Sequence, residues 1–449
     1  MANDRSALCY RRELTVRYAS DVLVVGGGPA GMAAALAAAR QGASVRLVES
    51  HSCLGGMGTA GMVPAFMQFT DGVNFLAGGV GQQVLEALRA AGGSVPAEGM
   101  GIRAEVLKRV YDNLLVDAGV PFTLHTQLVD VVAEQGRVHE AICAGKSGMF
   151  AIRAKVFVDC TGDGDLAAFA GATYEKGDAD GNMMPGTLCS LWAGIDWPKV
   201  RASGLGTGNK RIEDAFKDGV FTLEDRHLPG IWRVGETLGG GNIGHTFDVD
   251  GTDDESLTRA LQWGRKSLME YERYYKQYLK GFEAMELVST GSLLGVRETR
   301  RIIGDYILNV NDFNPSSTSE DEIGRYAYPI DIHVARPDKE SYDAFCKEFT
   351  SMRLGKGESY GIPYRILTPK GLDNVLVAGR CVSTDRSMQA SIRVMPGCYI
   401  TGQAAGVAAA MAAQAETSTR RLDIGDLQAR LKAMGAYLPS FEAVDHSPE

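Results

Sequence analysis

A glycine-rich turn between two short apolar runs constrains the fold of this chain more than any other feature. Residues 21–49 read DVLVVGGGPAGMAAALAAARQGASVRLVE, a pattern typical of a strand, a tight turn, a helix and a second strand. Gly26 permits the turn, Gly28 leaves room for a pyrophosphate against the backbone, and Gly31 allows helix and strand to pack closely. The pattern therefore predicts a βαβ unit that binds a dinucleotide.

Other residues of this unit suit other parts of such a ligand. Pro29 and Ala30 begin the helix, whose N-terminus offers unpaired N–H groups and a partial positive charge to phosphates. Glu49 follows the second strand, near the position from which an acidic side chain accepts hydrogen bonds from ribose hydroxyls. We expect all three residues to contact the cofactor.

Further glycine-rich segments follow along the chain, at 54–59 (LGGMGT), 157–165 (FVDCTGDGD), 375–380 (VLVAGR), 391–398 (SIRVMPGC) and 402–406 (GQAAG). Together with the opening unit and with residues 295–301 (GVRETRR), their order and spacing resemble the FAD-dependent oxidoreductase family, related to glutathione reductase and to the fumarate reductase flavoproteins. The resemblance covers about residues 20–413. It implies that the chain is an oxidoreductase and that its cofactor is FAD.

The resemblance also indicates which residues contact FAD outside the opening unit. They are Gly55, Gly56, Met57, Val129, Thr161, Gly162, Asp163, Gly379, Arg380, Arg393, Met395 and Gly402. Two interpretations of Arg380 stay open, a contact with phosphate or an ion pair with an acidic side chain. A small-residue helix is expected over 397–413, and its N-terminus would stabilise the negative charge of reduced flavin.

The predicted fold class is α/β, with a Rossmann-type FAD-binding domain that includes a β-meander, and an inserted α+β substrate domain. The FAD domain is expected over 20–60, 101–170 and 366–415, the substrate domain over 61–100 and 171–365, an N-terminal tail over 1–19, and a C-terminal helix and tail over 416–449. Helices are expected over 102–118 and 252–280, and strands near 120–133, 137–143 and 149–158.

A second match to the glycine pattern, at 239–244, lacks a preceding strand, so we interpret it as fortuitous. The chain then has one dinucleotide-binding domain, whereas glutathione reductase has a second one for NADPH. The paired cysteines of the disulfide reductases are also missing, because Cys53 stands alone in its segment. A flavin disulfide reductase is therefore not expected.

Composition limits the partners and the compartment. The net charge of −9 argues against nucleic acid and anionic membranes as partners, and no apolar run is long enough to span a bilayer. The eight cysteines form no C-x-x-C pair and the histidines show no zinc spacing, so no metal is expected. Without a secretory signal in the N-terminal residues, we expect a cytoplasmic protein. The oligomeric state stays open, with a homodimer as one alternative.

Three residues are candidates for catalysis. His245 is the best candidate for a general base, although it equally suits a hydrogen-bonded loop histidine. Arg297 and Arg301 are placed to bind an anionic substrate through a carboxylate, or else they form a structural ion-pair cluster with Glu298 and Arg300. Glu298 is a weaker candidate for a proton shuttle.

These observations favour an FAD-dependent dehydrogenase or oxidase that passes a hydride between a small organic molecule and flavin N5. Alcohols, amines and saturated carbon–carbon bonds all remain open as substrates. A flavin-dependent monooxygenase is the first alternative, because it shares this scaffold. The second alternative is a flavin-binding protein with a sensing or non-catalytic role.

Overall fold

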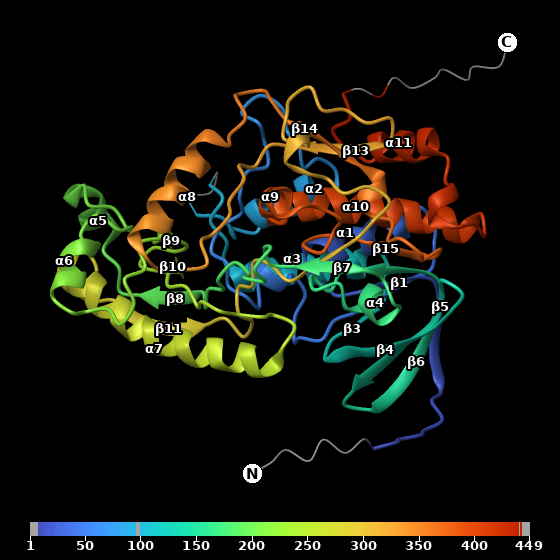
Figure 1. Ribbon diagram of the computed structural model, residues 1–449, viewed down its shortest axis with the longest axis horizontal. Coiled ribbons are helices and arrows are strands. Elements are labelled where there is room, and N and C mark those ends of the chain that lie inside the picture. The colour runs from blue at the N-terminus through green and yellow to red at the C-terminus, as the bar shows by residue number, and fades with distance from the viewer. Residues whose placement is uncertain (1–7, 96–98, 440, 442–449) are drawn as a thin grey trace.

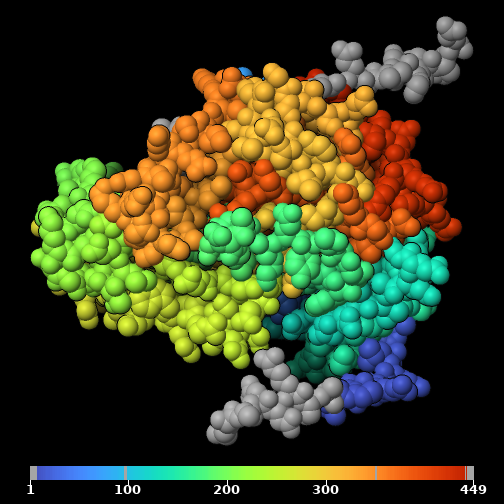
Figure 2. Space-filling model, viewed as in Figure 1, coloured from blue at the N-terminus to red at the C-terminus, as the bar shows by residue number. Residues whose placement is uncertain are grey.

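The computed structural model describes residues 8–95, 99–439 and 441. Residues 1–7 of the expected N-terminal tail, residues 96–98, and residues 440 and 442–449 of the expected C-terminal tail lie outside the described part. In Figure 1, a large mixed sheet with its helices occupies one side of the molecule, and a four-stranded sheet with the longest helix, α7 (Asp254–Tyr278), occupies the other. The second part forms a lobe, coloured green to yellow-green, at the left of Figure 2.

The large sheet contains the predicted βαβ unit and the predicted β-meander. Its strands are β1 (Val16–Val25), β2 (Val45–Val48), β3 (Phe122–Thr123), β4 (Thr126–Glu134), β5 (Arg137–Gly145), β6 (Gly148–Asp159) and β15 (Val375–Val377), in the order β3-β2-β1-β6-β5-β4 with β15 beside β6. Pairing is parallel from β3 through β6 and to β15, and antiparallel through β6, β5 and β4. The α/β class is thus confirmed. Because β1 begins at Val16, four residues of the expected tail belong to the sheet.

Two helices of small residues cover one face of this sheet. α1 (Pro29–Arg40) follows the glycine turn, and α10 (Met395–Gln414) confirms the helix expected near the C-terminus. An added Cβ on Gly402 would lie 2.2 Å from the carbonyl oxygen of Ala30, and one on Gly406 would lie 2.2 Å from that of Ala34. The two helices therefore approach to backbone contact, which only glycine permits at these positions.

The lobe consists of an antiparallel sheet and a long helix. The sheet has the order β11-β8-β10-β9, with β8 (Ser190–Ala193), β9 (Gly230–Arg233), β10 (Gly239–Asn242) and β11 (Glu286–Thr290), and the helix is α7 (Asp254–Tyr278). The second glycine match forms strand β10 and not a phosphate-binding turn, as expected. An added Cβ on Gly240 would lie 2.3 Å from Pro64 Cβ, so close packing explains this glycine.

The remaining elements connect or flank these two parts. The helices are α2 (Val80–Ala90), α3 (Ala104–Asp117), α4 (Asp165–Phe169), α5 (Trp197–Ser203), α6 (Ile212–Lys217), α8 (Lys339–Ser351), α9 (Arg386–Ile392) and α11 (Ile424–Ala433). β12 (Arg300–Ile302) pairs with β7 (Tyr174–Lys176), and β13 (Glu322–Tyr326) pairs with β14 (Tyr360–Pro363). No helix in the described ranges is long and apolar enough to cross a membrane.

Buried apolar side chains form two clusters that differ from the predicted domain boundaries. The smaller cluster runs from Leu188 to Leu294 within the lobe. The larger one surrounds the main sheet and also contains Phe66, Tyr326 and Ile362, from segments expected in the substrate domain. The reason is that β13 lies against α10, where an added Cβ on Gly324 would approach a methyl group of that helix to 2.6 Å.

Candidate active site

A cavity of about 740 Å³ joins the glycine-rich loops of the large sheet to the lobe. Most predicted cofactor residues line it: Gly26, Gly28, Pro29, Ala30, Glu49, Gly56, Met57, Thr161, Gly162, Asp163, Gly379, Arg380, Arg393 and Met395. Its other walls come from loops around residues 227–232, 292–297 and 328–333. Segments far apart in the chain thus form one continuous site.

Gly28 marks the part of the cavity that suits a pyrophosphate. Its φ of −66° is open to any residue, yet an added Cβ would meet no atom within 4 Å. Gly28 is also the N-cap of α1, and no side chain caps this helix. The first N–H groups of α1 therefore remain available to an anion beside an open space.

Four predicted cofactor residues do not line the cavity. An added Cβ on Gly31 would lie 1.8 Å from the carbonyl oxygen of Gly26, and one on Gly55 would lie 2.5 Å from the ring of Tyr111. Gly31 and Gly402 thus serve close packing against backbone, and Gly55 serves close packing against side chains. The fourth residue is Val129, and the preceding residues of β4, 126–128, line the cavity in its place.

Glu49 is a buried carboxylate held in place at the end of β2. Its Oε2 accepts a hydrogen bond from the Gly27 N–H at 2.6 Å, and its Oε1 accepts one from the His51 N–H at 2.8 Å. Burial raises the pKa of Glu49, but the hydrogen bonds from His51 and Gly27 outweigh it, so the pKa lies below its usual value. The ionised side chain faces the cavity and can accept hydrogen bonds from hydroxyl groups.

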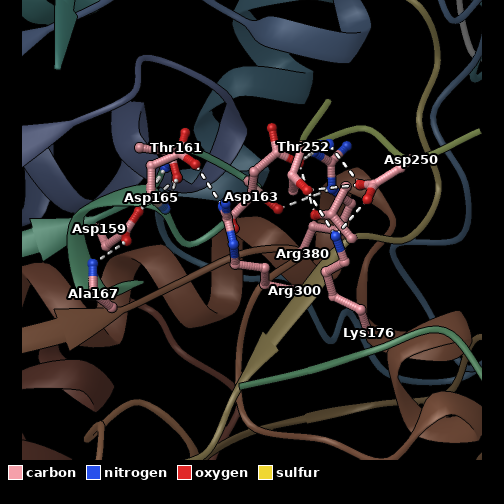
Figure 3. Close-up of polar contacts among 12 residues, drawn as sticks. Asp159, Thr161, Asp163, Asp165, Ala167, Lys176, Asp250, Thr252, Arg300 and Arg380 are labelled. Atoms are coloured by element: carbon pink, nitrogen blue, oxygen red, sulfur yellow. Dashed lines mark hydrogen bonds and ion pairs between the residues drawn. The ribbon is translucent and has the colours of Figure 1, made fainter. Parts of the chain in front are cut away.

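An ion-pair network fixes the loop that follows β6 (Figure 3). Arg380 donates to Asp163 at 2.5 Å and to the Gly162 carbonyl oxygen at 3.0 Å, while Arg300 pairs with Asp165 at 2.7 Å. Arg380 thus forms an ion pair with an acid, and because it also lines the cavity, a contact with phosphate stays a prediction. The network fixes residues 161–163 in the cavity wall.

The N-terminus of α10 also reaches the cavity. Val394 is its N-cap, without a side-chain cap, and Val394, Met395 and Cys398 all line the wall. Because the first turn of a helix leaves N–H groups unpaired, this end presents partial positive charge to the site. The expected role of this end in stabilising reduced flavin stays a prediction.

Arg297 stands in the cavity wall at the lobe, and no acidic side chain of the described residues pairs with it. Its guanidinium donates to the Pro185 carbonyl oxygen at 2.7 Å and to Thr187 Oγ1 at 3.0 Å, and the residue is 7% exposed. Among the described residues, no carboxylate oxygen lies within 4.0 Å of it. Burial, together with the charge of Arg393, lowers the pKa of Arg297 to about 10, so the group stays protonated at neutral pH.

Three histidines gather beside Arg297. His245 Nε2 lies 2.9 Å from His333 Nδ1, and the ring of His227 lies over that of His333 at a centroid distance of 4.2 Å. His227 and His333 line the cavity, whereas the predicted base His245 lies behind them. Burial lowers the pKa of His227 to about 3 and that of His333 well below its usual value, so both imidazoles are neutral.

The other catalytic candidates lie away from the cavity. Arg301 donates to Glu298 at 2.5 Å and to the Gly177 carbonyl oxygen at 3.0 Å. Glu298 is fully buried and also pairs with Arg386 at 3.1 Å. Neither Arg301 nor Glu298 lines the cavity, so of the two arginines only Arg297 is placed for a substrate. The structural interpretation holds for Arg301 and Glu298.

Sequence reasoning missed several polar residues of the lobe end. They are Asp225, His227, Asn242, Tyr328, Asp331 and His333. His333 is 88 residues from His245, and no motif or spacing relates the members of this group. Only the three-dimensional fold brings them together.

Comparison with protein families gives a match over most of the chain. The family model described as FAD dependent oxidoreductase matches residues 21–431. Digeranylgeranylglycerophospholipid reductase 2 from Methanopyrus kandleri is 28% identical over 153 residues, which are 32% of this chain and 37% of the relative. The match therefore spans little more than a third of that relative's length.

Solved structures of similar architecture have low sequence identity. A geranylgeranyl bacteriochlorophyll reductase-like protein from Thermoplasma acidophilum is 14% identical, with 93% of this chain and 84% of the other covered at a TM-score of 0.48. The p-nitrophenol 4-monooxygenase PnpA from Pseudomonas putida DLL-E4 is 13% identical, with 93% and 86% covered at a TM-score of 0.45.

Proposed function

Since this chain belongs to the family of FAD-dependent oxidoreductases, we propose that it exchanges a hydride with a small organic substrate that carries an anionic group. The single observation that carries the proposal is Arg297, a buried cation in the cavity wall with no acidic partner among the described residues. A buried charge needs a counter-charge, and a carboxylate can meet a guanidinium through two parallel hydrogen bonds.

The surroundings of Arg297 suit an organic molecule bound away from water. Asn242 Oδ1 lies 3.5 Å from the guanidinium, and apolar side chains continue the wall. These side chains include Met67, Leu228, Trp232, Leu257, Leu261 and Leu294. An apolar wall with a few polar groups orients a ligand and excludes water from the reacting atoms.

FAD, when bound, supplies a flavin that accepts or donates a hydride at N5. The chain itself holds the substrate's anionic group at Arg297 and provides neutral imidazoles at His227 and His333 beside it. A neutral imidazole can accept the proton that leaves a substrate hydroxyl or amine. His245 donates to or accepts from His333, and so acts through it as a positioning residue.

Anaerobic mixing of the FAD-loaded protein with a panel of small molecules tests this proposal. The panel contains hydroxy acids, amino acids and saturated acids, each beside its neutral amide. We expect an acid to bleach the flavin without any nicotinamide cofactor, and its amide to do so at least about tenfold more slowly. Arg297→Lys should raise the KM of the reducing acid, because lysine cannot reproduce the two-pronged contact.

Two outcomes of the same assay would contradict the proposal. If amides bleach the flavin as fast as acids, the substrate's anionic group is not recognised. If NADPH alone reduces the flavin and the reduced protein then hydroxylates a substrate with oxygen, the protein is a monooxygenase.

A further inference from the structure

The histidine cluster contains more ring nitrogens than its own hydrogen bonds can use. One nitrogen from each of His227, His245 and His333 lies within 4.8 Å of the other two. His245 Nε2 and His333 Nδ1, 2.9 Å apart, share one hydrogen bond. The buried Nδ1 of His227 has no hydrogen-bond partner among the described residues. His245 and His333 are each 4% exposed, so water does not readily satisfy this group.

Carboxylates stand behind two of these rings. Asp225 Oδ2 lies 3.1 Å from His245 Nδ1, the ring nitrogen that is not in contact with His333, and this nitrogen makes no hydrogen bond within the described part of the chain. Asp331 Oδ2 lies 3.4 Å from His333 Nε2, again on the side away from the shared contact. Metal-binding histidines characteristically have such a carboxylate at the second nitrogen, where it fixes the tautomer and the ring orientation.

We propose that His227, His245 and His333 bind one divalent transition-metal ion of the kind that prefers imidazole ligands, such as Zn²⁺, Fe²⁺ or Co²⁺. Metal–nitrogen bonds of about 2.0–2.1 Å place ligand nitrogens roughly 3.3 Å apart. The closest two ring nitrogens, of His245 and His333, are 2.9 Å apart. The widest separation between ring nitrogens, up to 4.8 Å, has to shorten by about 1.5 Å when the ion binds. Neutral imidazoles are the form that binds metal, and the nearby Asp225 and Asp331 offset part of the ion's charge.

An ion at this position would have an open coordination site. Three protein ligands leave a fourth position free in tetrahedral geometry, as in catalytic metal sites. His227 and His333 line the cavity together with Arg297, so that position faces the substrate space. With their ring nitrogens bound to the ion, His227 and His333 would not accept the proton themselves. The ion would instead bind a substrate oxygen and favour loss of its proton to water, a role that rests on the proposed function. Metal binding itself does not rest on it.

Metal content and titration of the FAD-loaded protein, purified without a histidine tag, test the proposal. After chelator treatment, we expect about one Zn²⁺ per chain to bind in calorimetry, and Co²⁺ to give a visible band beyond those of the flavin. His333→Ala and His227→Gln should remove this site, and Asp225→Asn should weaken binding by about 10–100-fold. His139→Ala, at an exposed histidine of β5, is the matched control and should bind like the original protein.

Flavin absorbance in every variant reports whether the fold and the FAD site persist. Saturable binding that is lost in His227→Gln but kept in His139→Ala, with FAD retained in both, supports the site. The proposal is overturned if the original protein shows no saturable binding, or if His333→Ala and His227→Gln bind as it does. Because no substrate is added, failure here leaves the assay with acids and amides unaffected.

Discussion

At the scale of single residues, the fold does not require glycine at position 28, whereas the proposed pyrophosphate site does. Its backbone is open to any residue, and an added Cβ would touch nothing in the protein. We therefore expect Gly28→Val to fold and to lose FAD, because the side chain fills the space left for the pyrophosphate. Heat denaturation of the purified original protein should release about one FAD per chain, and no FMN.

Gly425→Ala is a suitable control for this change. Gly425 lies in the first turn of α11, is exposed, and does not line the cavity that we assign to FAD. The control should keep its full FAD content, and circular dichroism should report the same helix content for all three proteins. A folded Gly28→Val protein with normal FAD content would show that the pyrophosphate lies elsewhere.

Cys53 should be dispensable for electron transfer. It is buried without lining the cavity, and its Sγ lies 3.8 Å from Thr59 Oγ1. All eight cysteines are free thiols. We expect Cys53→Ser to keep the rate of flavin reduction by the substrate within about threefold, measured by stopped flow. A hundredfold loss with FAD still bound, about 2.7 kcal/mol of barrier, would mean that this thiol takes part in the reaction.

At the scale of elements, local patterns predicted the dinucleotide end well. Strand β2 ends at Val48, directly before Glu49 as predicted, and the helices over 104–117 and 254–278 lie within two residues of the predicted bounds. Each of these elements carries its own turn or cap signals, which act over a few residues. The run at 120–133 instead divides into β3 and β4, because the two strands have different partners in the sheet.

Close packing of α1 against α10 leads to a prediction about stability. Gly402→Ala would place a methyl group 2.2 Å from a backbone carbonyl oxygen, which cannot rotate away. We expect the free energy of unfolding in urea to fall by about 1–3 kcal/mol. Alanine is otherwise favoured over glycine inside a helix by roughly 0.8–1 kcal/mol. Unchanged or increased stability would therefore contradict the close contact between the two helices.

At the scale of the whole molecule, the site depends on two parts of the fold that meet at one cavity. The glycine loops follow directly from strand and helix patterns, so the sequence could locate the cofactor end. The lobe end could not be found in this way, since Arg297, His227 and His333 come from separate loops without regular spacing. The sequence singled out His245 as a candidate base, and the packed structure puts it behind His333.

We propose that an anionic group binds at Arg297 in the cavity that we assign to FAD. Titration of the FAD-loaded protein with small carboxylates, followed by the absorbance of the bound flavin, tests it most directly. We expect a saturable spectral change with carboxylates and none with their amides. Arg297→Met should raise the apparent Kd at least about tenfold, or 1.4 kcal/mol, with FAD retained. Arg153→Met, at an exposed arginine of β6, should leave it unchanged. A flavin spectrum that carboxylates do not perturb, or an equal Kd in Arg297→Met, would show that Arg297 does not bind the anionic group.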